Sequence, residues 1–221
     1  MDQMQKRSIT TTTIVLEILN AVTHGIGLIG SLIALAFLFG KADYLQLDQI
    51  EMTSLVIYSV TLISLYLAST LYHSFVFTKV HRFFQIIDHS NIFLLIAGTY
   101  TPYCLIVIAN TLGRWLLAGI WLLAIGGILL HILTDGRFQN VETTIYVAMG
   151  WLCMLAVKPL YANLSTSGFW LLVAGGIVFT LGAVIYSITR RFKGGLAGHL
   201  IWHLFVMLGT TCMFLSIYLN L

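Results

Sequence analysis

Seven long apolar stretches are the feature that most limits how this chain can fold. Each is close to the roughly 20 apolar residues that a helix needs to cross a bilayer. They run over residues 14–39, 53–77, 84–108, 114–133, 142–161, 168–189 and 197–219. Their connections are short, and the alternating strand pattern of a membrane barrel is missing. The prediction is an all-α polytopic membrane protein, with residues 1–221 forming a single membrane domain of seven transmembrane helices and residues 1–13 a short tail.

The scarcity of charge supports this prediction. Charged residues make up 9% of the 221 residues and hydrophobic residues 59%, whereas a soluble domain carries about 25% charged residues. An ordinary soluble enzyme and a disordered chain are therefore excluded. The eleven Lys and Arg residues are too scattered for a phosphate-binding patch, so no nucleic-acid partner is expected. The three cysteines lie in apolar runs without CxxC spacing and are interpreted as small core residues.

The basic residues predict which end of the bundle faces the cytoplasm. If the N-terminus lies inside, the cytoplasmic segments hold eight Lys and Arg residues and the outer segments hold three. The eight are Lys6, Arg7, Lys79, Arg82, Arg137, Arg190, Arg191 and Lys193, and the three are Lys41, Arg114 and Lys158. By the positive-inside rule, the N-terminus is predicted to be cytoplasmic and the C-terminus to lie outside.

Ionisable side chains inside the spans are the candidate functional positions, because placing them in hydrocarbon is costly. Of the eight acidic residues, only Glu17 and Asp88 lie within spans, whereas six of the seven histidines lie in or at one. His199 and His203 are four residues apart on the seventh span and share one helix face. Ser69 of the second span lies four residues before His73, so these two residues also share one helix face.

Several of these candidates lie at a common depth. His73, Asp88 and His199 each stand six residues from a basic residue of a loop on the predicted cytoplasmic side. At 1.5 Å per residue, each lies about 9 Å from that loop residue. His203 lies one turn deeper. The topology is therefore predicted to bring polar groups of the second, third and seventh spans to a similar level.

Three histidines with one free coordination position would suit a catalytic zinc ion. His73, His199 and His203 are the predicted ligands of Zn2+. Interhelical hydrogen bonding is the plainer alternative, and copper or nickel also bind histidine. Zinc lowers the pKa of bound water toward about 7, so Asp88 could accept its proton. Ser69 could orient His73 or stabilise an oxyanion. The alternatives are a bond to its own helix backbone for Ser69, and a helix cap or a cation pair for Asp88.

Three further polar residues share one face of the first span. Glu17, Asn20 and His24 follow one another at steps of three and four. They are predicted to form a polar packing seam that faces the cavity, with proton relay or substrate contact as the alternative. His89 lies about 100° around the helix from its neighbour Asp88, so it is not expected to face the same metal. His131 is expected to snorkel at the interface.

Together, these motifs resemble the haemolysin III and progestin and adipoQ receptor (PAQR) proteins. These belong to the wider CREST superfamily, which includes the alkaline ceramidases. The resemblance rests on Ser69-xxx-His73, Asp88, His199-xxx-His203, Glu17-xx-Asn20-xxx-His24-Gly25 and the stretches 67–73, 94–102 and 148–151. It covers nearly the whole chain and is closest to the bacterial haemolysin III branch, which is associated with membrane homeostasis. It implies a seven-helix bundle with a cytoplasmic N-terminus, zinc on the three histidines and Asp88 near the metal-bound water.

The resemblance also implies a set of functions. Receptor members are associated with hydrolysis of ceramide-like lipid amides, and bacterial members with haemolysis or membrane-lipid homeostasis. The chain lacks the long N-terminal region of the adiponectin receptors, so membrane lipids are the expected partners and no soluble hormone is. The expected location is the bacterial inner (plasma) membrane, and the oligomeric state is left open.

The leading hypothesis is a zinc-dependent, ceramidase-like hydrolase of lipid amides or esters that acts in membrane-lipid homeostasis. The alternatives are a non-catalytic sensor of membrane state with structural zinc, and a pore-forming haemolysin. A pore would need a polar stripe along several helices, whereas the polar groups here gather at one depth.

Overall fold

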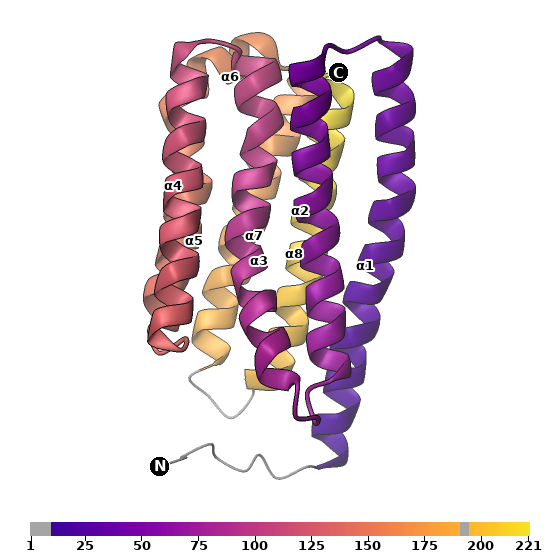
Figure 1. The fold of residues 1–221 in the computed structure, drawn as a ribbon, viewed down its shortest axis with the longest axis vertical. Helices are drawn as coiled ribbons and strands as arrows, with labels where there is room; N and C mark the ends of the chain where they lie inside the picture. The colour runs from indigo at the N-terminus through magenta and orange to yellow at the C-terminus, as the bar shows by residue number, and fades with distance from the viewer. Residues whose placement is uncertain (1–9, 191–194) are drawn as a thin grey trace.

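The computed structural model describes residues 10–190 and 195–221, with side chains throughout these ranges except at residues 195 and 196. Within these ranges, seven helical segments are long and apolar enough to cross a membrane. The predicted all-α, seven-span architecture is therefore confirmed (Figure 1). Four basic residues used for the orientation, Lys6, Arg7, Arg191 and Lys193, lie outside the described residues.

The helix boundaries show that two spans are not regular throughout. The helices are α1 (Thr11–Tyr44), α2 (Gln49–Ser74), α3 (His81–Pro102), α4 (Thr111–Thr134), α5 (Gln139–Trp151), α6 (Val157–Asn163), α7 (Thr166–Thr189) and α8 (Gly195–Leu219). A π-helical segment, Tyr103–Ile108, continues α3 directly after Pro102. A 3-10 segment, Leu152–Ala156, joins α5 to α6, so the fifth span is interrupted in its course.

Polar caps set where several spans begin. The Asp48 carboxylate accepts from the backbone N–H groups of Ile50 and Glu51, and the Glu51 side chain accepts in return from the Asp48 N–H. This reciprocal capping box satisfies N–H groups that have no partner inside α2. Asn110 and Ser165 cap α4 and α7 through their side-chain oxygens. All three caps lie at the end of the bundle where α8 ends (Figure 1).

The seven spans close into a ring. Packing runs from α1 through α2, α3, α4, α5 and α7 to α8, and α8 returns to α1. The contacts of α7 with α8 and of α2 with α3 are the most extensive, whereas α5 packs more loosely on both of its neighbours. α1 begins and α8 ends at opposite ends of the bundle (Figure 1). Which end faces the cytoplasm stays a prediction.

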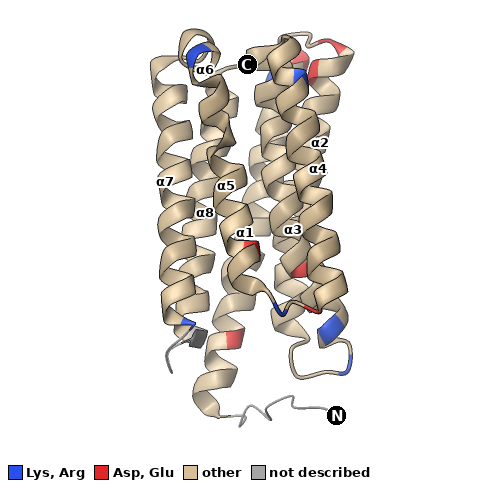
Figure 2. Ribbon diagram, turned by 90° about the vertical axis from the view of Figure 1, so that its left-hand side faces the viewer, with Lys and Arg blue, Asp and Glu red and all other residues tan. Residues whose placement is uncertain are grey.

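The outer surface of the bundle is apolar. Large side chains such as Ile29 and Leu122 are 62% and 70% exposed in the middle of their helices. Charged residues lie mostly toward the two ends of the bundle (Figure 2). A surface of this kind suits lipid, because hydrocarbon solvates apolar side chains and leaves backbone groups to be satisfied within the helices.

A glycine allows three helices to meet beside the candidate site. A Cβ atom at Gly27 of α1 would overlap the ring of Tyr66 on α2, so this ring packs directly on the α1 backbone. The Tyr66 hydroxyl lies 2.6 Å from the Thr210 hydroxyl of α8. One tyrosine therefore joins α1, α2 and α8. Small residues such as Gly27 allow close helix packing of this kind in membranes.

Candidate metal centre

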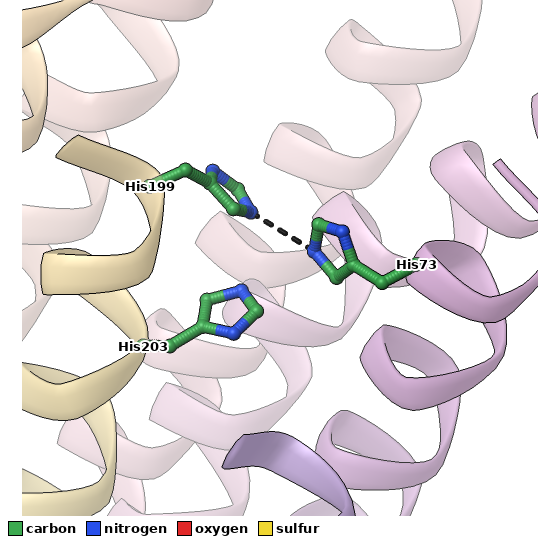
Figure 3. Close-up of side chains that lie close together, drawn as sticks. All are labelled: His73, His199 and His203. Atoms are coloured by element: carbon green, nitrogen blue, oxygen red, sulfur yellow. Dashed lines mark hydrogen bonds between the residues drawn. The ribbon is translucent and has the colours of Figure 1, made fainter. Parts of the chain in front are cut away.

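His73, His199 and His203 converge at the end of the bundle where α1 begins. His73 lies in the last turn of α2, and the other two lie one turn apart near the start of α8. One ring nitrogen of each histidine lies within 4.8 Å of the others. Figure 3 shows the three imidazoles gathered side by side, with His73 Nε2 3.1 Å from His199 Nε2. His73 and His203 are buried, and His199 is half-buried.

This group of side chains could hold a metal ion. Neutral imidazole nitrogen is a usual zinc ligand, and three protein ligands leave one position of a tetrahedral site open. With zinc–nitrogen bonds of about 2.0–2.1 Å, two ligand nitrogens of a tetrahedral site lie about 3.3 Å apart. The 3.1 Å between His73 and His199 is close to this value. The predicted histidine cluster is therefore assembled, while the identity of any metal stays a prediction.

Glu17 of α1 orients His73. Its Oε2 atom accepts a hydrogen bond from His73 Nδ1 at 2.6 Å, and the two side chains are 4% and 3% exposed. Because the proton is held on Nδ1, the lone pair of Nε2 is available on the side of the other histidines. A carboxylate behind a metal-binding histidine fixes the ring and increases its basicity. The predicted polar seam on α1 thus contacts a candidate ligand directly.

The other two residues of this seam lie near His203 and inside the core. The His24 and His203 rings stack with centroids 3.6 Å apart and an interplanar angle of 11°. Asn20 is fully buried. Within the described part of the chain, neither the amide atoms of Asn20 nor the ring nitrogens of His24 have a hydrogen-bond partner. Buried polar atoms usually have hydrogen-bond partners, so a polar ligand in the pocket could form hydrogen bonds with these atoms.

One polar pocket brings the remaining predicted residues to the histidines. Ser69 and Asp88 line it together with His24, His199 and His203. Ser69 Oγ is buried and bonds no described residue, so the alternative bond to its own helix backbone is not formed. Asp88 lies inside α3 rather than at its cap, and its carboxylate Oδ2 lies 3.8 Å from Nδ1 of the neighbouring His89 imidazole. The cap alternative for Asp88 is therefore wrong.

Sequence reasoning missed a second buried ionisable group. The expectation that His131 snorkels is wrong: its side chain is buried, with Nδ1 3.1 Å from both carboxylate oxygens of Glu142. Glu142 is itself buried at the start of α5, and the His131 ring stacks on that of His89 at 5.2 Å. The available signal was a histidine and an acid on either side of a short interhelical connection, eleven residues apart. Hydropathy alone assigned both to the ends of their spans.

An apolar cavity adjoins the polar pocket. The two share lining residues, among them Leu65, Ile92 and Trp202, so they lie side by side. Together with the part open to its surroundings, the apolar cleft measures about 980 Å³. Trp151 of α5 donates from Nε1 to Thr180 Oγ1 of α7 at 3.0 Å, and both residues line this cleft. The bond therefore spans the loosely packed contact between α5 and α7.

Comparison with known proteins identifies the family. A sequence profile described as Haemolysin-III related matches residues 12–214. This chain belongs to the haemolysin-III related family. "Hemolysin-3" of Bacillus cereus is 46% identical over 201 residues, covering 91% of this chain and 90% of that protein. "Hemolysin-3 homolog" of Bacillus subtilis (strain 168) is 46% identical over 206 residues, covering 93% and 94%. The human "Monocyte to macrophage differentiation factor" is 28% identical over 194 residues, covering 85% and 76%.

The family assignment confirms the resemblance found in the motifs. The matched region extends from before Glu17 to beyond His203, so it contains every candidate site residue of this haemolysin-III related chain. With seven apolar spans and similar bacterial proteins, the chain is an integral membrane protein. The two bacterial relatives are named as hemolysins, and none of the three names states a bond-breaking reaction.

Proposed function

We propose that this haemolysin-III related protein is a zinc-dependent membrane hydrolase that cleaves a lipid amide or ester and so contributes to membrane-lipid homeostasis. The observation that carries the proposal is the junction of two pockets. A polar pocket lined by His199, His203, Asp88 and Ser69 adjoins an apolar cleft inside the membrane-spanning bundle. Such a junction suits a substrate with a polar linkage and a long acyl chain.

The residues of the polar pocket would divide the chemistry among them. His73, His199 and His203 would hold the metal, with Glu17 keeping His73 in its orientation. Bound zinc supplies Lewis-acid activation of water and of a carbonyl group in sites of this kind. Asp88 would accept the proton of the attacking water. The Ser69 hydroxyl, which bonds no other described residue, would donate to the carbonyl oxygen as negative charge develops there.

The apolar cleft would hold the acyl chain. Its walls come from α2, α3, α5, α7 and α8 and include Leu95, Leu172 and Phe179. Burial of apolar surface contributes about 25 cal/mol per Å², so a chain of many methylenes would bind here without polar contacts. The contact bridged by Trp151 and Thr180 is the proposed route from the bilayer, because it is a loosely packed wall of the cleft.

The first test measures metal and turnover together. The purified protein is reconstituted in nanodiscs and assayed for zinc per chain and for hydrolysis of fluorescent fatty amides and esters. Asp88→Asn should retain zinc and lose about 10²-fold or more in kcat, because a general base contributes 10²- to 10⁴-fold. The double variant His199→Ala, His203→Ala should lose both zinc and turnover.

The matched control is Asp135→Asn. Asp135 is an exposed acid outside the pocket that pairs with Arg82. It should leave zinc content and turnover unchanged. Unchanged turnover in Asp88→Asn, or a folded wild type that takes up no zinc, would defeat the proposed mechanism.

A non-catalytic sensor with structural zinc is the second candidate. The histidine group connects α2 and α8, and α1 adds Glu17 and the His24 ring. A metal here would therefore hold three helices together. In that case Asp88→Asn keeps full biological function without turnover. The pore alternative is disfavoured, because the cleft beyond the polar pocket is apolar rather than lined by a continuous polar stripe.

A further inference from the structure

The polar pocket has ionisable side chains that the mechanism above does not use. His89 of α3 and Glu142 of α5 line the same pocket as His199 and His203. His131 of α4 pairs with Glu142, and its ring lies parallel to that of His89, with an interplanar angle of 5°. Ionisable groups buried in a membrane bundle are costly and by default mark function. These three come from helices other than those that carry the metal-binding candidates.

Backbone geometry fixes the tautomer of His89. Its Nδ1 lies 2.9 Å from the carbonyl oxygen of Gln85. A carbonyl oxygen can only accept, so Nδ1 carries a proton. Within the described part of the chain, Nε2 makes no hydrogen bond and is left for the pocket that the ring lines. The stacked His131 ring holds the plane of the imidazole, and Tyr146 donates to the His89 carbonyl at 3.2 Å.

The charges around His89 suit an imidazole that is protonated during a reaction. Asp88 Oδ2 lies 3.8 Å from its Nδ1, and the carboxylate of Glu142 lines the same pocket. The cation that shares this pocket, Arg190, is engaged with the side-chain oxygens of Gln139 and Asn140. A charged group in a low-dielectric site needs opposite charge nearby, and Asp88 supplies it directly, while Glu142 bonds the His131 ring that stacks on His89.

We propose that His89 is a second catalytic residue, the proton donor to the leaving group when a lipid amide bond breaks. This inference rests on the hydrolase function proposed above. The oxygen of water bonds to the carbonyl carbon, and one proton of that water passes to Asp88. The C–N bond then breaks, its electron pair stays with the nitrogen, and the nitrogen takes a proton from Nε2 of protonated His89. The Asp88 proton returns to Nε2, so one water is consumed and one carboxylic acid and one amine are formed.

The nature of the leaving group provides the test. An alkylamine cannot leave without a proton, whereas 4-nitrophenolate can. The substrates are an N-alkyl fatty amide and the 4-nitrophenyl ester of the same fatty acid, and the variant is His89→Gln. We expect kcat/KM to fall about 10²-fold or more on the amide and less than about threefold on the ester, as loss of a general acid predicts. Added imidazole should restore part of the amide activity in His89→Ala.

His81→Gln is the matched control. His81 is half-buried and does not line the pocket, and its Nδ1 also bonds a backbone carbonyl, that of Thr78, at 3.0 Å. It therefore repeats the chemical change outside the pocket and should leave both activities unchanged. Zinc per chain is measured in every variant as a readout that does not depend on turnover. It should stay at the wild-type value in His89→Gln.

The outcomes separate this inference from the proposed function. If zinc-loaded wild type hydrolyses neither substrate, the hydrolase function fails and the inference fails with it. If the wild type is active and His89→Gln loses amide and ester activity equally, or loses neither, the inference alone is overturned. If His89→Gln does not retain zinc, the loss of amide activity relative to ester activity is measured in Glu142→Gln instead. Because Glu142 provides charge beside the ring, its variant should lose amide activity selectively, and equal or no loss would overturn the inference.

Discussion

The bundle has two sides that are built differently. On the side formed by α1, α2 and α8, buried contacts lock the metal-binding candidates: Glu17 holds His73, His24 stacks on His203, and Tyr66 joins all three helices. On the side formed by α5 and α7, packing is looser, the fifth span is interrupted by a 3-10 segment, and the bond from Trp151 to Thr180 joins the two helices beside the cleft. A site needs fixed geometry, whereas entry of a lipid needs a wall that can move. Helices α1, α2 and α8 therefore meet the need for fixed geometry, and α5 and α7 meet the need for a wall that can move.

Glu17→Gln is the strongest probe of the locked side. The amide can still accept from His73 Nδ1 but carries no charge, so the ring keeps its place and loses basicity. Loss of such a partner weakens metal binding by about 10- to 100-fold. Competition with a chelator of known zinc affinity measures the change. Glu51→Gln, a change at a helix cap outside the pocket, is the control. Equal zinc affinity in the two variants would show that Glu17 is only a packing residue.

Gly27→Ala tests how tightly the same side is packed. The added methyl group would overlap the Tyr66 ring, so the ring or α1 must shift. Overpacking of this kind costs about 1–3 kcal/mol. Thermal unfolding in nanodiscs should show a lower midpoint. Gly30→Ala, whose Cβ would meet nothing within 4 Å, should unfold like the wild type. Identical midpoints for both variants would contradict the contrast between the two sides.

The sequence predicts the spans and the histidine group well, for physical reasons. Bilayer thickness fixes the length of each apolar run, and the helical repeat places His199 and His203 on one face. The pairing of His131 with Glu142 could not be predicted in the same way. Hydropathy puts each residue at the end of a span, and only the packing of α4 against α5 buries them together. Asp88 and His89 point about 100° apart on α3, yet both line one broad pocket, which helix geometry alone does not predict.

Trp151→Phe tests the looser side and should have the smallest effect. The change keeps an aromatic ring and removes the N–H that bonds Thr180, so α5 and α7 lose the bond that joins them beside the cleft. One neutral hydrogen bond contributes about 0.5–1.5 kcal/mol, which corresponds to a change of about twofold to tenfold in the population of an open state. Hydrolysis of long-chain substrates should change by a factor in this range, while water-soluble short-chain esters react as before.

Thr180→Val should have the same effect, and the two changes together should add nothing further, because both remove one bond. Trp170→Phe is the control, since Trp170 is exposed and does not line the cleft. An equal response of long and short substrates would place lipid entry elsewhere in the ring and leave α5 and α7 as a wall without a gate.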